Sequence, residues 1–229
     1  TLEGVNNKDL PSTFGKKILL FGDSITQSIN TFASSTESWT TFTDEYLKAQ
    51  IFNYAKDGAA YKDKVATSTD WQRISYQLSQ SETDGVSADV VFFACGTNDG
   101  LNGITNFADA MAVANIGDLD REDLYEAIRY AFWKARLLHP NAIFFVANIL
   151  QRTANSPTYY APVNLAIKQM AEYYNMIYID SSAESGIVRE FEVDGSSGLF
   201  LSDGLHPNTT GRKKLAAFFS TKILQNFIK

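Results

Sequence analysis

A serine stands near the start of the chain at a place where an apolar run ends in a turn. Residues 17–21 are mostly apolar, which predicts a buried strand, and Gly22-Asp23-Ser24 follows directly. A glycine at the end of a buried parallel strand lets the backbone turn sharply. The next residues then lie at the carboxyl edge of the sheet, where open α/β sheets bind ligands. We therefore interpret Ser24 as a candidate nucleophile.

A nucleophilic Ser24 needs a base within hydrogen-bond reach, because a serine hydroxyl is barely ionised at neutral pH. The chain contains two histidines, His139 and His206. His139 precedes Pro140 at the end of a predicted helix, where a residue that can carry positive charge is favoured for structural reasons alone. His206 follows Asp203 closely, so one turn can bring the carboxylate to the imidazole and fix its tautomer. Taken alone, this second stretch fits an ordinary turn before a helix equally well.

An acyl-transfer site also needs hydrogen-bond donors for the oxyanion that develops in the tetrahedral intermediate. The candidates are the backbone N–H of Ser24, the backbone N–H of Gly58 and the side-chain amide of Asn98. Gly58 alone fits a common Asp-Gly turn. Asn98 follows the strongest predicted strand, residues 89–94, at the edge where Ser24 is expected.

Further polar and aromatic residues are predicted near the same edge. Asp23 is expected to brace its own turn through backbone hydrogen bonds, and Asp99 could do the same. Both also remain candidates for substrate binding, as do Tyr159 and Tyr160. Polar loops that carry a few aromatic residues favour a carbohydrate over a long acyl chain as the bound group. The aromatic residues of these loops are Phe32, Trp39, Phe107, Tyr159 and Tyr160.

Four stretches of the chain together resemble the Ser-Gly-Asn-His (SGNH) hydrolases, also called the GDSL family of lipases and esterases. They are residues 22–26, 53–58, 96–99 and 203–207, and they occur in the family's order. Isoleucine replaces the leucine of the family's name in the first stretch. The second stretch is weak by itself, whereas the other three are specific.

The resemblance implies a two-step acyl transfer without metal or cofactor. Ser24 would attack an ester carbonyl, His206 would take its proton, and Asp203 would orient His206. The N–H groups of Ser24 and Gly58 and the amide of Asn98 would hold the oxyanion. The resemblance also implies a flavodoxin-like α/β fold, a three-layer α/β/α sandwich with five parallel strands in the order 2-1-3-4-5.

The periodicity of the chain predicts the elements that would position these residues. Five apolar runs alternate with helical patterns, which indicates a parallel sheet with helices on both faces. The predicted strands are 17–21, 51–54, 89–94, 142–148 and 176–180. The predicted helices are 38–49, 70–81, 120–138, 161–174 and 208–227, with a broken helical stretch at 183–191. Residues 101–117 show neither period and are expected to form a wall or lid of the pocket.

Composition limits the remaining possibilities. The 229 residues, 45% of them hydrophobic, suit a single domain over 1–229 with an irregular arm at 1–15. The net charge of −6 argues against nucleic acid as a partner, and no apolar run is long enough for membrane insertion. Two histidines and one cysteine are too few for a typical zinc site. A secreted or periplasmic location fits if a leader was removed before Thr1.

Several readings of function stay open. A non-catalytic carbohydrate-binding module on the same fold would be expected to have lost Ser24, Asn98 or His206. A nucleotide-binding protein should show a glycine-rich phosphate loop after the first strand, where Asp23 would instead repel phosphate. Among ester hydrolases, we expect activity on short-chain O-acetyl esters, such as an acetylated small molecule or polysaccharide. The alternative is a lipase, lysophospholipase or thioesterase acting on longer acyl chains.

Overall fold

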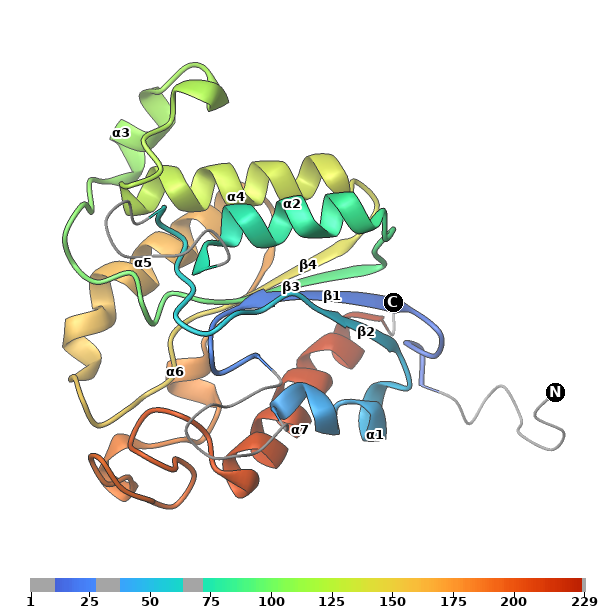
Figure 1. Cartoon of the computed structure of the whole chain (residues 1–229), viewed down its shortest axis with the longest axis vertical. Helices are drawn as coiled ribbons and strands as arrows, with labels where there is room; N and C mark the ends of the chain where they lie inside the picture. Colours follow the sequence, from blue (N-terminus) through green and yellow to red (C-terminus); the bar gives the residue numbers. More distant parts are fainter. Residues whose placement is uncertain (1–10, 28–37, 64–71, 228–229) are drawn as a thin grey trace, which may run out of the picture.

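The computed structural model of the chain describes residues 11–27, 38–63 and 72–227. Within these residues, five parallel strands form one sheet in the order β2-β1-β3-β4-β5 (Figure 1). The strands are β1 (Lys17–Gly22), β2 (Gln50–Asn53), β3 (Val90–Ala94), β4 (Ile143–Ala147) and β5 (Ile177–Ile179). The predicted α/β fold and its strand order are therefore confirmed.

Helices cover both faces of the sheet and complete the three layers (Figure 1). One face carries α2 (Ile74–Asp84), α4 (Leu124–Leu138) and α5 (Pro157–Tyr173), and the other carries α1 (Asp44–Leu47) and α7 (Thr209–Phe227). Short helices in the connections are η2 (Trp39–Phe42), α3 (Phe107–Ala112), η4 (Ile116–Asp118), α6 (Ser181–Glu184) and η5 (Arg189–Phe191). None of the described helices has the length and apolar character that crossing a membrane requires.

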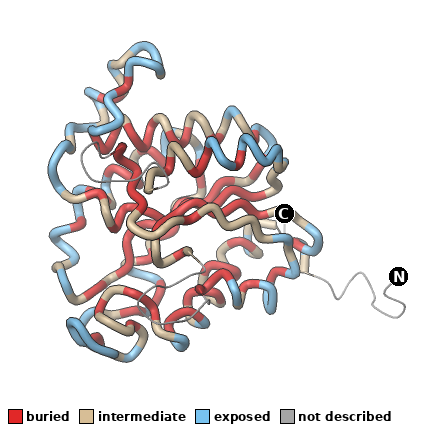
Figure 2. The backbone as a smooth tube through the Cα atoms, viewed as in Figure 1, coloured by how far each residue is buried: buried red, intermediate tan, exposed pale blue. Residues whose placement is uncertain are grey.

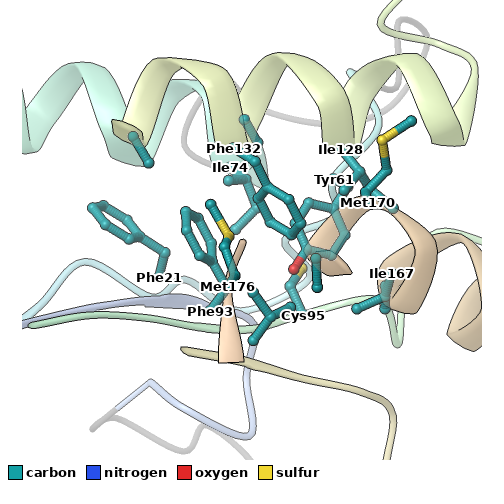
Figure 3. Packing of buried hydrophobic residues seen from close by; sticks show 14 of the residues in the cluster. Phe21, Tyr61, Ile74, Phe93, Cys95, Ile128, Phe132, Ile167, Met170 and Met176 are labelled. Carbon is teal, nitrogen blue, oxygen red and sulfur yellow. The ribbon is translucent and has the colours of Figure 1, made fainter. Parts of the chain in front are cut away.

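The side chains of β1 alternate between two buried clusters, one on each face of the sheet. Phe21 belongs to the cluster under α2, α4 and α5, whereas Leu20 belongs to the cluster over α7. Figure 2 shows that the central strands are buried, and Figure 3 shows Phe21 beside Phe93, with ring centroids 5.2 Å apart. The three inner strands, β1, β3 and β4, are largely buried, and strands buried on both faces read as continuous apolar runs, which explains why the sequence located them.

The predicted helix over 38–49 is wrong, because two short pieces, η2 and α1, occupy this stretch. Nearby hydroxyl side chains form hydrogen bonds with backbone groups that a continuous helix would use for its own bonding. Ser38 Oγ accepts a hydrogen bond from Thr40 N, and Thr43 Oγ1 donates to Thr40 O at 2.6 Å. Lys48 then adopts a left-handed conformation with φ of 48° and ends the segment. Serine and threonine hydroxyls compete with helical bonding in a way that periodicity does not register.

The helix predicted over 120–138 begins later, because Asp123 rather than Asp120 caps it. The Asp123 carboxylate accepts a hydrogen bond from Glu126 N, which makes Asp123 the N-cap. The same carboxylate accepts from the backbone N and the hydroxyl of Thr105 at 2.8 and 2.9 Å. A contact with the preceding connection thus decides which of two aspartates caps α4.

The segment 101–117, predicted to be irregular, contains α3 and η4. Arg129 of α4 fastens this segment by donating to the backbone oxygens of Ala110 and Val113 at 2.5 and 2.8 Å. Part of the segment lines a groove of about 440 Å³ that also involves the turn after β2. The segment therefore packs as an extension of the helical layer, from which α3 projects in Figure 1.

Helix α5 begins at Pro157, earlier than the predicted range 161–174. The Ser156 side chain caps its first turn and Pro157 is the first helical residue, both of which are typical of a helix start. Pro162, predicted in the first turn, therefore lies inside the helix. The helical stretch predicted over 183–191 likewise divides into α6 and η5.

His139 is buried at the end of α4, and neither ring nitrogen meets a hydrogen-bond partner among the described residues. Burial lowers the pKa of His139 below its usual 6.5. The unfolded chain then binds a proton more readily than the folded protein, so we expect stability to fall as the pH drops below about 6.5. His139→Phe should remove this part of the loss.

The measurement is urea unfolding of the wild type and His139→Phe at about pH 8 and about pH 5. Comparing the two proteins cancels the contributions of other titrating groups. An equal loss of unfolding free energy in both would contradict the expectation.

Candidate active site

The turn after β1 places Ser24 at the carboxyl edge of the sheet. The buried side-chain amide of Gln77 in α2 donates to Gly22 O at 2.8 Å and accepts from Gly22 N at 3.0 Å, which fixes the end of the strand. A Cβ atom on Gly22 would lie 2.5 Å from Ala94 O of the neighbouring strand β3. Only glycine therefore allows this close approach, after which the chain leaves the sheet at Ser24.

Asp23 lies beneath this turn, with 2% of its surface exposed. Its Oδ1 accepts from Ile25 N at 3.0 Å, in agreement with the predicted brace. Burial raises the pKa of Asp23 to about 6, although the Ile25 N–H and the positive charge of Arg152 favour the carboxylate. Asp23 also borders a small cavity of about 20 Å³ under the turn. Its side chain thus faces the interior rather than a surface on which a substrate could lie.

The loop before α7 brings an imidazole and a carboxylate to Ser24. The Nε2 atom of His206 lies 3.0 Å from Ser24 Oγ, and Nδ1 lies 2.7 Å from Asp203 Oδ2. The other oxygen, Asp203 Oδ1, accepts from the backbone N atoms of Leu205 and His206 at 2.9 and 2.7 Å. With its proton on Nδ1 and donated to Asp203, the ring presents Nε2 as the acceptor for the serine hydroxyl.

The electrostatics of Asp203 suit this arrangement. Burial alone would raise the pKa of Asp203, but hydrogen bonds from the His206 ring and from the N–H groups of His206 and Leu205 lower it below its usual value. The carboxylate is therefore charged at neutral pH. A charged partner holds the ring in one tautomer and stabilises the imidazolium that would form when Ser24 loses its proton.

Gly204 allows the loop with Asp203 and His206 to lie against the connection after β4. Its φ is +81°, a left-handed conformation that favours glycine. Its carbonyl oxygen accepts from Thr153 N at 2.9 Å, and a Cβ atom on Gly204 would lie 2.0 Å from Thr153 Oγ1. Gly204, between Asp203 and His206, is thus needed both for the turn and for close packing against Thr153.

The predicted oxyanion donors come from the turns after β2 and β3, the strands on either side of β1. Asn98 Nδ2 donates to Ala59 O at 2.9 Å and so ties the two turns together. Gly58 has a φ of +71°, and a Cβ atom on it would lie 2.4 Å from Gln72 Nε2. The structure therefore gathers Ser24, Gly58 and Asn98 at one edge of the sheet.

Asp99 holds the turn after β2 in place through hydrogen bonds to its backbone. It is buried, and its two carboxylate oxygens accept from Tyr61 N at 3.1 Å and from Lys62 N at 2.9 Å. This is the bracing role that the sequence suggested, although the turn it braces is the neighbouring one rather than its own. Its burial does not favour the expectation that Asp99 contacts substrate.

The aromatic residues predicted as a carbohydrate platform do not form one surface. Trp39 and Tyr160 are buried, and Phe107 is half-buried. Phe32 lies outside the described residues. Tyr159, at 39% exposed, is the aromatic residue of this set that a ligand could reach within the described part of the chain.

Two residues that sequence reasoning missed also help to build the site. Gln77 secures the end of β1, and its position on the inward face of a predicted helix, between Ile74 and Leu78, was the available signal. Arg152 is buried in the connection after β4, and its Nη2 donates to Thr97 O at 3.3 Å, directly before Asn98. A basic residue just past the carboxyl end of a buried strand was the signal there.

His139 lies at the amino edge of the sheet, where the chain passes from α4 into β4, and so on the side opposite Ser24. The described residues contain no group of His, Cys, Asp or Glu side chains arranged to hold a metal ion. His206 contacts Ser24 Oγ and Asp203 contacts His206, and these two groups suit proton transfer.

The sequence profile of the GDSL-like Lipase/Acylhydrolase family matches residues 20–214 of the chain. The chain belongs to this family. The match begins within β1 and extends into α7, so it includes every turn described above. This GDSL-like protein is accordingly a hydrolase of the family that includes esterases and lipases. No curated protein sequence matches the chain significantly.

Solved structures with the same fold carry names from this group of hydrolases. A possible lipase from Chitinophaga pinensis is 15% identical with a TM-score of 0.71, covering 93% of this chain and 100% of that one. A family two carbohydrate esterase from Clostridium thermocellum, in complex with cellohexaose, is 18% identical with a TM-score of 0.64, covering 93% and 65%. Est24, a carbohydrate acetylesterase from Sinorhizobium meliloti, is 13% identical with a TM-score of 0.61, covering 91% and 98%. At these identities the likeness concerns the fold.

Proposed function

We propose that the protein is a serine esterase that hydrolyses carboxylic esters through an acyl-enzyme on Ser24. The observation that supports this most strongly is the pair of contacts from Ser24 Oγ to His206 Nε2, at 3.0 Å, and from His206 Nδ1 to Asp203 Oδ2, at 2.7 Å. A nucleophile, a base and a group that orients the base are the parts that serine-based acyl transfer requires.

In the first step, Ser24 Oγ attacks the carbonyl carbon of the ester while its proton passes to His206 Nε2. The carbonyl oxygen becomes an oxyanion, for which the N–H groups of Ser24 and Gly58 and the amide of Asn98 are the proposed donors. When the intermediate collapses, the alkoxide leaves with the proton from His206, so an alcohol is released and the acyl group stays on Ser24. In the second step, water gives a proton to His206 and attacks the acyl carbon, and Ser24 leaves as the hydroxyl again.

A short acyl group, such as acetyl on a carbohydrate, is the substrate we favour. Tyr159 is exposed at the start of α5 and offers a ring face for a sugar. Two structures of the same fold are named as carbohydrate esterases, which is consistent with this substrate class.

A longer acyl chain is the second candidate, and a different surface favours it. Phe191, Val193 and Leu199 are 62%, 49% and 53% exposed on the connection that precedes Asp203. Exposed apolar side chains this close together in the chain offer a place for an aliphatic tail.

Hydrolysis of p-nitrophenyl esters of increasing acyl length tests the choice. We expect kcat/KM to be highest for acetate and to fall at butyrate and beyond, as a preference for short-chain O-acetyl esters requires. A maximum at octanoate or longer would overturn the short-chain proposal and favour the apolar surface. Absence of hydrolysis for every ester in the series would overturn the esterase proposal itself.

A further inference from the structure

Arg152 carries a buried positive charge that no ion pair with a carboxylate of the described residues neutralises. It is 8% exposed, its guanidinium lies 4.0 Å from the centre of the Tyr160 ring, and Nη2 donates to Thr97 O at 3.3 Å. Its Nε meets no hydrogen-bond partner, and no carboxylate within the described ranges forms an ion pair with it. Buried charges in proteins are usually paired, so this placement calls for an explanation.

The position of Arg152 connects the two halves of the site. Arg152 holds the carbonyl of Thr97, whose peptide bond continues to Asn98, the proposed oxyanion donor. The next residue, Thr153, donates its N–H to Gly204 O at 2.9 Å, between Asp203 and His206. Two consecutive residues thus link the turn with the proposed oxyanion donor to the loop with the proposed base.

The positive charge of Arg152 lies near enough to interact with Asp23, the residue before Ser24. Burial lowers the pKa of Arg152 while the negative charge of Asp23 opposes that effect, and a guanidinium stays protonated throughout the working pH range. In an interior of low dielectric, a fixed positive charge favours a nearby group that becomes negative during the reaction. The ester is neutral before attack by Ser24 and negative in the tetrahedral intermediate.

We propose that Arg152 is a positioning residue that fixes Asn98 through the Thr97 carbonyl and whose buried charge favours the tetrahedral intermediate over the neutral ester. The inference rests on the proposed esterase function. It assigns Arg152 no direct contact with substrate, since its accessible surface is small and Nη2 is already bonded within the protein.

The test compares Arg152→Met with Arg129→Met. Arg129 is a matched control because it is also 8% exposed, also donates to backbone carbonyl oxygens and also has an Nε without a partner among the described residues, but it holds α3 rather than the site. With p-nitrophenyl acetate, we expect Arg152→Met to lower kcat by about 10- to 100-fold with KM changed less than about threefold. Arg129→Met should lose stability in urea unfolding but keep kcat within about twofold.

A boronic acid that forms a negative tetrahedral adduct with Ser24 provides a second readout. Its inhibition constant should weaken in Arg152→Met by about the same factor as kcat/KM, whereas the KM of the neutral ester hardly changes. Arg152→Lys keeps the positive charge but loses the planar guanidinium group with its several N–H donors. It should therefore retain part of the kcat that Arg152→Met loses.

Three outcomes would overturn the inference. The first is unchanged kcat in Arg152→Met, and the second is an equal loss of kcat in the Arg129 control, which would indicate a merely structural role. The third is a KM increase confined to negatively charged esters, which would make Arg152 an anion-binding residue. An inactive wild type would instead be a failure of the proposed function, so the two can be told apart.

Discussion

Ser24→Ala is expected to lower kcat for ester hydrolysis by about 10³-fold to 10⁶-fold with little change in folding stability. The hydroxyl is the group that would form the acyl-enzyme, and alanine offers no substitute. The remaining rate would come from the oxyanion donors and from water, which still give some catalysis when a nucleophile is removed. The measurement is kcat and KM for p-nitrophenyl acetate, together with urea unfolding of both proteins.

Ser79→Ala is a matched control for this substitution. Ser79 is an exposed serine of α2 whose hydroxyl donates to Ser75 O of the same helix. It should retain full activity. If Ser24→Ala kept more than about a tenth of the wild-type kcat, Ser24 would not be the nucleophile.

His206→Gln is expected to cause the second large loss, about 10³-fold to 10⁵-fold in kcat. Glutamine has similar length and can still form hydrogen bonds, but it cannot take the proton of Ser24. Because nucleophile and base act as one unit, the double variant Ser24→Ala/His206→Gln should be hardly less active than Ser24→Ala alone. Rates for all three variants with p-nitrophenyl acetate check this.

The second histidine supplies the control for His206. His139→Phe should keep kcat near the wild-type value, because His139 lies at the amino edge of the sheet, opposite Ser24. Fully additive losses in the double variant would contradict a shared role of Ser24 and His206. A large loss of kcat in His139→Phe at neutral pH, with folding intact, would contradict the assignment of His206 rather than His139 as the base.

The parts of the site that could be predicted from the sequence are positions where the backbone geometry or a close contact allows only one residue type. Gly22 must be glycine because β3 passes close by, and Gly204 must be glycine because of its left-handed φ and its contact with Thr153. Gly22 and Asn98, which follow buried apolar runs, are therefore visible in the sequence. The strand order then places Ser24, Gly58 and Asn98, which follow β1, β2 and β3, at one edge of the sheet.

The parts that could not be predicted depend on which of several similar groups makes a distant contact. Asp123 caps α4 in place of Asp120 because it also binds Thr105. Tyr160 is buried beneath Arg152, although its neighbour Tyr159 is exposed. Periodicity records which residues are apolar, but it does not tell which polar side chain finds its partner on another element.

The most direct test of the account is to locate the covalent intermediate. An organophosphate that reacts with activated serines should inactivate the protein with one equivalent bound, and peptide mass spectrometry should find the adduct on Ser24. In His206→Gln the same labelling should slow by several orders of magnitude, because Ser24 would no longer lose its proton to the ring. Labelling of another residue, or continued ester hydrolysis with Ser24 unlabelled, would contradict the claim that Ser24, activated by His206, carries the acyl group.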